Sequence, residues 1–112
     1  MKWLALRFGG QRWSVHVVGP RSKHLLDGND DAKVAMCFFE TCSIYISSAL
    51  EESAREDALL HELLHALLYV SGAEAAYSGD PKREEALVTA LTPLLHGALK
   101  DLGFRFPKGI SQ

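Results

Sequence analysis

Hydrophobic and polar residues alternate in the first part of the chain with the two-residue period of a β-strand. Residues 3–8 and 13–18 follow this pattern and are separated by a glycine-containing turn at 9–12, which predicts a first hairpin. Residues 21–31 are polar and rich in turn-forming side chains. We therefore expect a surface loop after the hairpin.

A second pair of strands is predicted after this loop. Residues 34–39 and 42–47 are mostly apolar and flank a short polar turn. Ile44 and Ile46 are two positions apart, so they lie on one face of the second strand. The pattern predicts a second hairpin with one apolar face.

The second half of the chain changes to the period of a helix. Apolar residues recur every three or four positions from 53 to 70. Ser53 and Glu56 have the spacing of a capping box at the start of this helix, and Ser48 is an alternative cap that would begin it a turn or more earlier. Gly72 stands where a C-terminal glycine ends a helix.

A second helix is predicted over 81–102. Asp80 is a favourable N-cap, and Pro81 suits the first helical position because its missing N–H is not needed there. Gly103 follows the last predicted turn. Pro93 lies inside the helix, so we expect a kink or a break just before it.

Strands in the first half and helices in the second are typical of the α+β class. We expect a small antiparallel or mixed sheet of three to four strands, formed by the N-terminal half, to pack on the two main α-helices. With 112 residues the chain has the length of one domain, and we expect residues 1–112 to form it.

Charge and hydropathy narrow the range of partners. A net charge of −2 and a pI near 6.2 provide no basic face for nucleic acid, which we do not expect as a partner. No stretch reaches the roughly 18 apolar residues of a membrane span, and charges interrupt the first residues before a signal-peptide core could form. We expect a cytoplasmic protein without a membrane partner, in which Cys37 and Cys42 are free thiols used in packing.

The strongest chemical signal lies inside the first predicted helix, where residues 61–65 read HELLH. Two histidines four positions apart project from the same face of a helix, so both imidazoles can bind one metal ion. In the HExxH pattern the glutamate, here Glu62, takes a proton from a zinc-bound water. His61 and His65 lie at the margin of the leucine face, which is the position of a cleft wall.

A zinc ion held for catalysis takes three protein ligands, so a third must come from elsewhere in the chain. Glu84 falls on the leucine-rich face of the second predicted helix, and Glu85 is rotated from it by about 100°. An acid such as Glu85 in a first turn is also favoured by the helix dipole without any metal. We therefore predict His61, His65 and Glu84 as the zinc ligands, with Glu85 or Glu74 as alternatives.

The other histidines are weaker candidates for ligands. His96 lies about 120° from the leucine-rich face, so we expect it to be exposed. His16 and His24 lie in a strand and a loop without partner spacing, so we expect ordinary histidines there. Asp80 is also downstream of the motif and is interpreted as a helix cap.

At this point the chain resembles a known family. The residues HELLHALL at 61–68, followed by EEALV at 84–88 and Leu91, are similar to the small HExxH…E zincins, including minigluzincins and ImmA/IrrE-type metallopeptidases, which are frequent in phages and prophages. The resemblance covers residues 44–102. In the family an Asp or Asn often follows the ligand glutamate by four positions, where this chain has Val88. The resemblance implies a zincin-like fold in which strand 43–47, or its hairpin partner, forms the rim of a substrate cleft.

These observations together predict a zinc-dependent metallopeptidase that hydrolyses peptide bonds of a peptide or protein substrate, with Glu62 as the general base. The alternative is a zinc-binding regulatory or interaction module of phage or prophage type with little or no peptidase activity. The sequence leaves the oligomeric state open. Tyr77 is a weak candidate for stabilising the transition state, with Tyr69 and Tyr45 as equal guesses. Residues 104–112 are expected to be a docked or frayed terminus rather than a cover for the cleft.

Overall fold

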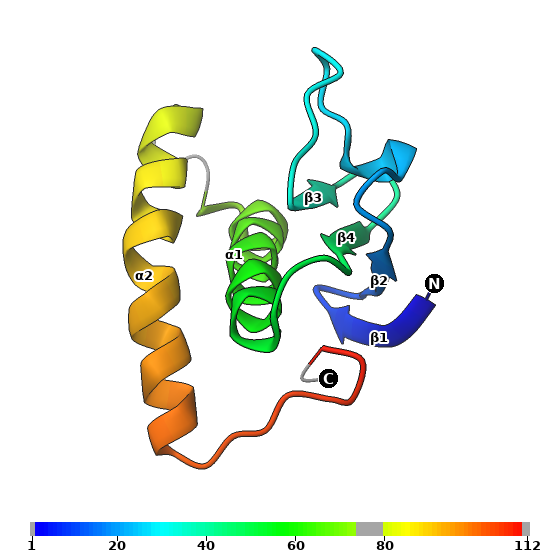
Figure 1. Ribbon diagram of the computed structural model, residues 1–112. Helices are drawn as coiled ribbons and strands as arrows, with labels where there is room; N and C mark the ends of the chain where they lie inside the picture. Colours follow the sequence, from blue (N-terminus) through cyan, green and yellow to red (C-terminus); the bar gives the residue numbers. More distant parts are fainter. Residues whose placement is uncertain (1, 74–79, 111–112) are drawn as a thin grey trace.

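The fold is that of a computed structural model, which describes residues 2–73 and 80–110. It consists of a sheet, the helix α1 packed on one face of that sheet, and the helix α2 packed on α1 (Figure 1). Along the chain the elements are β1 (Lys2–Phe8), β2 (Gln11–Val18), the 3₁₀ turn η1 (Lys23–Leu25), β3 (Ala35–Phe38), β4 (Ser43–Ser47), α1 (Glu52–Ser71) and α2 (Pro81–Asp101). The predicted α+β class is confirmed.

The four strands lie in the order β1-β2-β4-β3. Both predicted hairpins are present, since β1 pairs with β2 and β3 pairs with β4 in antiparallel fashion. The two hairpins join through β2 and β4, which run parallel, so the sheet is mixed. This order leaves β3 at one edge of the sheet, with its second side unpaired by any described strand.

The first hairpin turns through two glycines and rests against α1. Gly9 and Gly10 have φ values of 60° and 76°, the left-handed region that glycine adopts without a steric penalty. A Cβ atom on Gly9 would collide with the side chain of Val70 near the end of α1. The turn therefore needs glycine both for its backbone conformation and for its close approach to the helix.

The main core lies between the sheet and α1. Alternation along the strands turns one face of β2 and β4 toward the helix, and both isoleucines predicted to share a face are fully buried there. The side chains from the sheet and from α1 that form this cluster are Trp13, Val15, Ile44, Ile46, Leu59, Leu60 and Ala66. Burial of this apolar surface fixes the helix against the sheet.

The start of α1 differs from both predicted caps. The N-cap is Glu51, which makes no side-chain capping bond. Glu56 does not reach back to Ser53, because its carboxylate is 1% exposed and is bound to side chains of α2. Ser48 donates its backbone N–H to Val18 and so continues the ladder between β4 and β2. The predicted end is confirmed, with Gly72 in the left-handed conformation at φ 76°.

The start of α2 agrees with the prediction, and of the kink or break expected before Pro93 the break does not occur. The Asp80 carboxylate accepts a hydrogen bond from the N–H of Lys82 at 3.0 Å, as an N-cap should. The helix then runs unbroken from Pro81 to Asp101, although a break before Pro93 was one of the expected outcomes. The burial of Val88 and Thr92 against α1 holds both halves of α2 in one helix.

The buried face of α2 is not the leucine-rich face that the sequence predicts. Its buried residues are Val88, Thr92 and His96. Leu94 is 70% exposed and Leu102 is 83% exposed. The helix is therefore rotated about its axis relative to the prediction, and this rotation changes which side chains meet α1.

The segment after Gly103 passes below α1 toward the first hairpin (Figure 1). Phe106 and Ile110 are buried and belong to the main hydrophobic cluster. Neither lines the cavity described below, so the expectation of a docked terminus is confirmed for the part of this segment that the structure describes. Among the described residues, no helix is both long enough and apolar enough to cross a membrane.

Candidate metal centre

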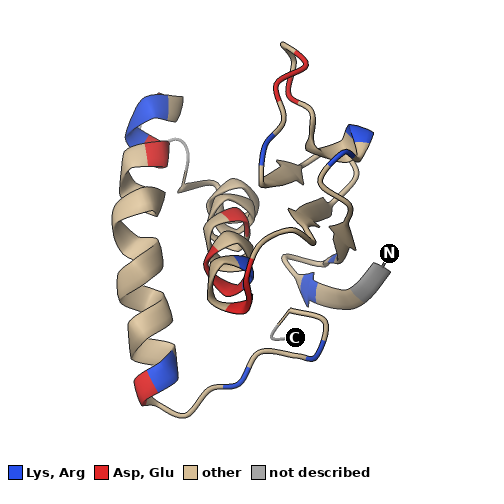
Figure 2. Cartoon of the chain, in the orientation of Figure 1, with Lys and Arg blue, Asp and Glu red and all other residues tan. Residues whose placement is uncertain are grey.

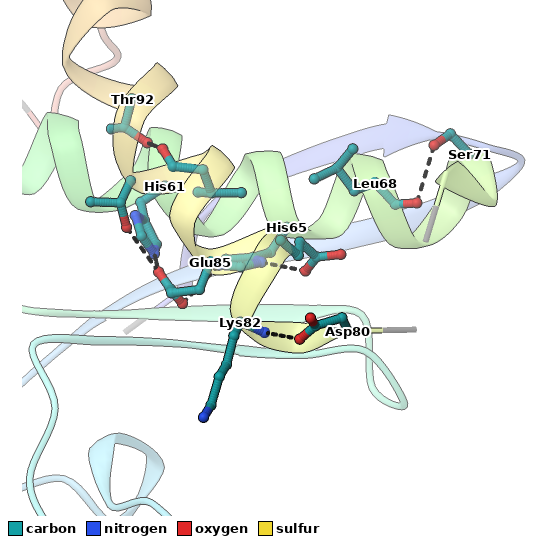
Figure 3. Close-up of polar contacts among 11 residues, drawn as sticks. His61, His65, Leu68, Ser71, Asp80, Lys82, Glu85 and Thr92 are labelled. Atoms are coloured by element: carbon teal, nitrogen blue, oxygen red, sulfur yellow. Dashed lines mark hydrogen bonds and ion pairs between the residues drawn. The ribbon is translucent and has the colours of Figure 1, made fainter. Parts of the chain in front are cut away.

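The HExxH motif lies in the middle of α1, on the side that faces the first turns of α2 (Figure 3). His61 and His65 are one helical turn apart, and their ring centroids are 5.0 Å from each other. Both rings are partly buried between the two helices. The motif therefore has the placement predicted for it, with two imidazoles directed to one place.

Glu85 of α2 completes this group. One carboxylate oxygen lies 2.7 Å from Nε2 of His61, and the other lies 3.3 Å from Nε2 of His65. Each of the three residues offers one ligand atom, and these atoms lie within 4.8 Å of one another. Two nitrogens and one oxygen at this spacing are the donor set of a three-ligand zinc site.

Glu84 has a different place from the one predicted. Its carboxylate lies 2.6 Å from Nδ1 of His65, the ring nitrogen on the side away from Glu85. It does face α1, as helical phase indicated, and it is only 13% exposed. The structure nevertheless brings Glu85, and not Glu84, into the group with His61 and His65. The reason is the rotation of α2, which puts the two glutamates on either side of the line of contact with α1.

The contacts around His65 fit a bound cation. If its Nδ1–H donates to Glu84, the lone pair of a neutral ring is on Nε2, and this lone pair faces the Glu85 carboxylate. Two electron-rich atoms attract each other only through a proton or a metal ion between them. The donor set therefore matches a metal site in which Glu84 orients His65.

A hydroxyl holds the Glu85 carboxylate in the same way. Thr89 donates a hydrogen bond to Glu85 at 3.2 Å from the next turn of α2. The residue four positions after Glu84 is Val88. Its apolar side chain departs from the Asp or Asn that often stands there in the family that the sequence resembles. Counted from Glu85, that position is Thr89, whose side chain is polar and hydrogen-bonded. A polar side chain therefore follows Glu85 by four positions, although it is a threonine and not the Asp or Asn of the resembled family.

Glu62 lines the cavity next to the two histidines and is partly buried. Burial raises the pKa of its carboxyl to about 7, although the charge of His65 lowers it and that of Glu85 raises it further. Glu62 is not one of the three grouped ligands. Its position is the one predicted for a proton acceptor beside a metal ion.

The candidate metal centre opens into a cavity of about 670 Å³ between α1, α2 and the edge strand β3. Ala35 and Met36 of β3 form one wall together with Val34. Of the two strands that the sequence offered as the rim of a cleft, β3 is therefore the one that borders this cavity. The remaining wall comes from the two helices and the segments before α1 and β3. Its residues are Lys33, Leu50, Ala54, Asp57, Ala58, His61, Glu62, His65, Glu85, Thr89, Thr92 and Pro93.

Neither of the two tyrosines in the described part of the chain offers a transition-state donor to the cavity. Tyr45 is stacked between His16 and His24, and Tyr69 is stacked on Phe39 with a centroid distance of 4.4 Å. Neither tyrosine lines the cavity. Tyr77 and Glu74 lie outside the residues that the structure describes.

Both cysteines are free thiols, as expected. Cys37 packs against the main hydrophobic cluster from β3. Burial raises its pKa to about 12, and the negative charges of Glu62, Cys42 and Glu84 contribute to the rise. A thiol with this pKa is a poor nucleophile, which agrees with a packing role.

His96 is the polar residue that sequence reasoning placed wrongly. It is buried rather than exposed, with Nε2 2.8 Å from Glu56 and Nδ1 2.6 Å from Asp57. Lys100 lies 2.9 Å from the same Glu56 oxygen. The signal that could have found this cluster is the row Val88, Thr92, His96, which repeats every four residues and carries two polar side chains.

Comparison of the chain with protein-family models, with curated proteins and with solved structures finds no match. The function is therefore argued from the geometry of the site.

Proposed function

We propose that this protein is a zinc-dependent metallopeptidase whose metal ligands are His61, His65 and Glu85. The observation that supports it is the approach of one carboxylate to two histidine Nε2 atoms of an HExxH helix, at 2.7 Å and 3.3 Å, inside a cavity. A surface ion pair does not require a second histidine, a carboxylate such as Glu84 on the other ring nitrogen of His65, or Glu62 in the wall of the same cavity. The arrangement is that of a catalytic site with three protein ligands.

Each residue has a distinct part in the proposed reaction. When bound, zinc supplies Lewis-acid activation of water and of the scissile carbonyl. Glu62 takes the proton of the attacking water on its carboxylate and delivers it to the nitrogen of the leaving amine. Glu84 holds the His65 ring in one tautomer, and Thr89 holds the Glu85 carboxylate.

An extended peptide is the substrate form that the cavity accommodates. β3 pairs with β4 on one side, and its other side borders the cavity. A peptide that adds to this edge forms backbone hydrogen bonds, which position a carbonyl without selecting particular side chains. The free thiols support a reducing compartment such as the cytoplasm as the place of action.

Metal content together with Glu62→Gln tests the proposal. Wild-type protein purified without added metal should contain about one zinc per chain and cleave a mixture of unstructured peptides. Glu62→Gln should keep the zinc and lose at least about a hundredfold in cleavage rate. Wild-type protein that binds no zinc would contradict the proposal.

A second candidate is a zinc-binding regulatory module with little peptidase activity. It is favoured by the side-chain hydrogen-bond donors of the described cavity wall, which besides the histidines are Lys33, Thr89 and Thr92. Lys33 pairs with Asp27 at 3.4 Å. Thr89 donates to Glu85 and Thr92 donates to a backbone carbonyl, so neither is free to stabilise an oxyanion. Zinc binding without cleavage by the wild type would favour this candidate.

A further inference from the structure

α2 is an outer layer of the molecule, with α1 on one side only (Figure 1). Between Glu85 and Lys100 it contains no lysine, arginine, aspartate or glutamate, so the middle of the helix carries none of these charged side chains, as Figure 2 shows. A helix that is apolar on all sides is normally buried on all sides. The covered side of α2 contains the buried residues Val88, Thr92 and His96, together with Leu95 and Leu99, which pack against the main hydrophobic cluster.

The uncovered side of α2 has a regular pattern. Apolar residues recur there at alternating spacings of four and three, which is the spacing of a coiled-coil seam. Leu94 at the middle of this row is mostly exposed, and Leu91 is exposed as well. We call this row the outer stripe; its residues are Arg83, Leu87, Leu91, Leu94, Ala98 and Asp101.

The two ends of the outer stripe have opposite charges. Arg83 lies in the first turn and Asp101 is the last residue of the helix. Both are exposed, and neither forms an ion pair with another residue in the part of the chain that the structure describes. The stripe is therefore complementary to a copy of itself that runs in the opposite direction.

We propose that the outer stripe is the contact surface of a homodimer in which two α2 helices pack antiparallel. The two-fold axis then passes between Leu91 and Leu94. Leu91 contacts Leu94 of the partner subunit, and Leu94 contacts Leu91 of the partner subunit. Leu87 lies opposite Ala98 of the partner subunit, and Arg83 lies opposite Asp101 of the partner subunit. The two-fold symmetry makes each of these contacts occur twice in the dimer. A parallel pairing would instead put like charges together at both ends.

The size of the stripe predicts a weak, concentration-dependent dimer. A helix of 21 residues is about 31 Å long. Two such helices in contact bury on the order of 1,000 Å², the lower end of specific interfaces. The stripe contains no residue that lines the cavity, so the dimer leaves the candidate metal centre open and does not depend on the proposed function.

Sedimentation velocity on the full chain, from low-micromolar to millimolar concentration, tests the dimer. The average mass should rise from one chain toward two. Leu94→Glu should remain a monomer throughout, because it buries two carboxylates beside the two-fold axis. Ala86→Glu, an exposed position of the same helix off the stripe, is the control and should dimerise as the wild type does. A wild type with the mass of one chain at every concentration would overturn the proposal.

A charge exchange tests the antiparallel register with variants that leave the apolar contact intact. Arg83→Asp should weaken the dimer several-fold, and Arg83→Asp combined with Asp101→Arg should restore it. Lys82→Asp makes the same charge change on the neighbouring exposed residue and should have no effect. A dimer whose dissociation constant does not respond to Arg83→Asp at low salt would show that the register is wrong.

Discussion

Two clusters of charged side chains join α1 to α2, and they are built from similar residues. The candidate metal centre has His61 and His65 from α1 with Glu84 and Glu85 from α2. The second cluster, which we call the lysine cluster, has Glu56 and Asp57 from α1 with His96 and Lys100 from α2. In both, histidine nitrogens lie within 3 Å of carboxylates that come from the opposite helix.

The two clusters differ in the source of positive charge. In the lysine cluster the Lys100 ammonium lies 2.9 Å from Glu56 and supplies it from within the chain. Among the described residues, no lysine or arginine pairs with Glu84 or Glu85. A neighbouring positive charge favours the charged form of a carboxylate. The chain supplies a positive charge itself in the lysine cluster, and in the proposed function a metal ion supplies it in the candidate metal centre.

The two clusters also differ in access. In the lysine cluster the ring of Phe106 stands edge-on to His96 at 5.7 Å and Glu56 is 1% exposed, while Asp57 at its margin also lines the cavity. The candidate metal centre opens into the cavity, where a metal ion and a substrate can reach it. The buried pair of Glu56 and His96 suits a structural role, and the more open candidate metal centre is the one for which we propose chemistry.

The largest expected effect is on stability, and it should separate the two clusters. His96→Ala should lower the free energy of unfolding by about 3 kcal/mol, because Glu56 stays buried and loses its contact with the His96 ring. His61→Ala in metal-free protein should cost less than about 1 kcal/mol, because that ring is partly exposed and its partner Glu85 is 55% exposed. Urea denaturation in the presence of a chelator measures both. Equal losses would remove the distinction between the clusters.

Zinc should stabilise the folded protein through one cluster only. At a free zinc concentration of about a hundred times the dissociation constant, the free energy of unfolding of the wild type should rise by about 2.7 kcal/mol. His96→Ala should show the same increment, since its site is intact, and Glu85→Ala should show almost none. Thermal unfolding with and without zinc gives the comparison. A similar zinc increment in Glu85→Ala would exclude Glu85 as a ligand.

The two neighbouring glutamates should differ in their effect on zinc affinity. Glu84→Ala should weaken binding by about tenfold to a hundredfold, because His65 loses the acceptor that orients it. Glu84→Gln keeps an acceptor oxygen and should be milder, and Glu85→Ala should be the most severe. Competition with a chromophoric chelator measures the three constants. If Glu84→Ala were the more severe of the two alanine variants, the assignment of ligand and orienting residue would be reversed.

The smallest expected effect comes from the hydroxyl that holds Glu85. Thr89→Val keeps the shape of the side chain and removes its hydrogen bond, so zinc binding should weaken by about 1 kcal/mol. Thr89→Ser restores the hydroxyl and should recover most of the affinity. The same chelator competition applies. An affinity unchanged in Thr89→Val would mean that Glu85 is held by the metal and the histidines alone.

Much of the fold was predictable because its signals are local. Gly9 and Gly10 specify a tight turn, Asp80 and Pro81 specify a helix start, and the alternation around Ile44 specifies a strand with one buried face. Each of these depends on residues within a few positions of one another. The parallel pairing of β2 with β4 has no such signal, since it joins segments about thirty residues apart.

The sequence by itself determined that His61 and His65 share one helix face with Glu62 beside them, because a spacing of four residues fixes their geometry on any helix. Only the tertiary structure decided that Glu85 joins them, that Glu84 orients His65, and that His96 is buried. These outcomes depend on the rotation of α2 about its axis. α2 is apolar on two sides, so hydrophobic periodicity allows more than one rotation, and the packing of Val88 and Thr92 on α1 selects one of them.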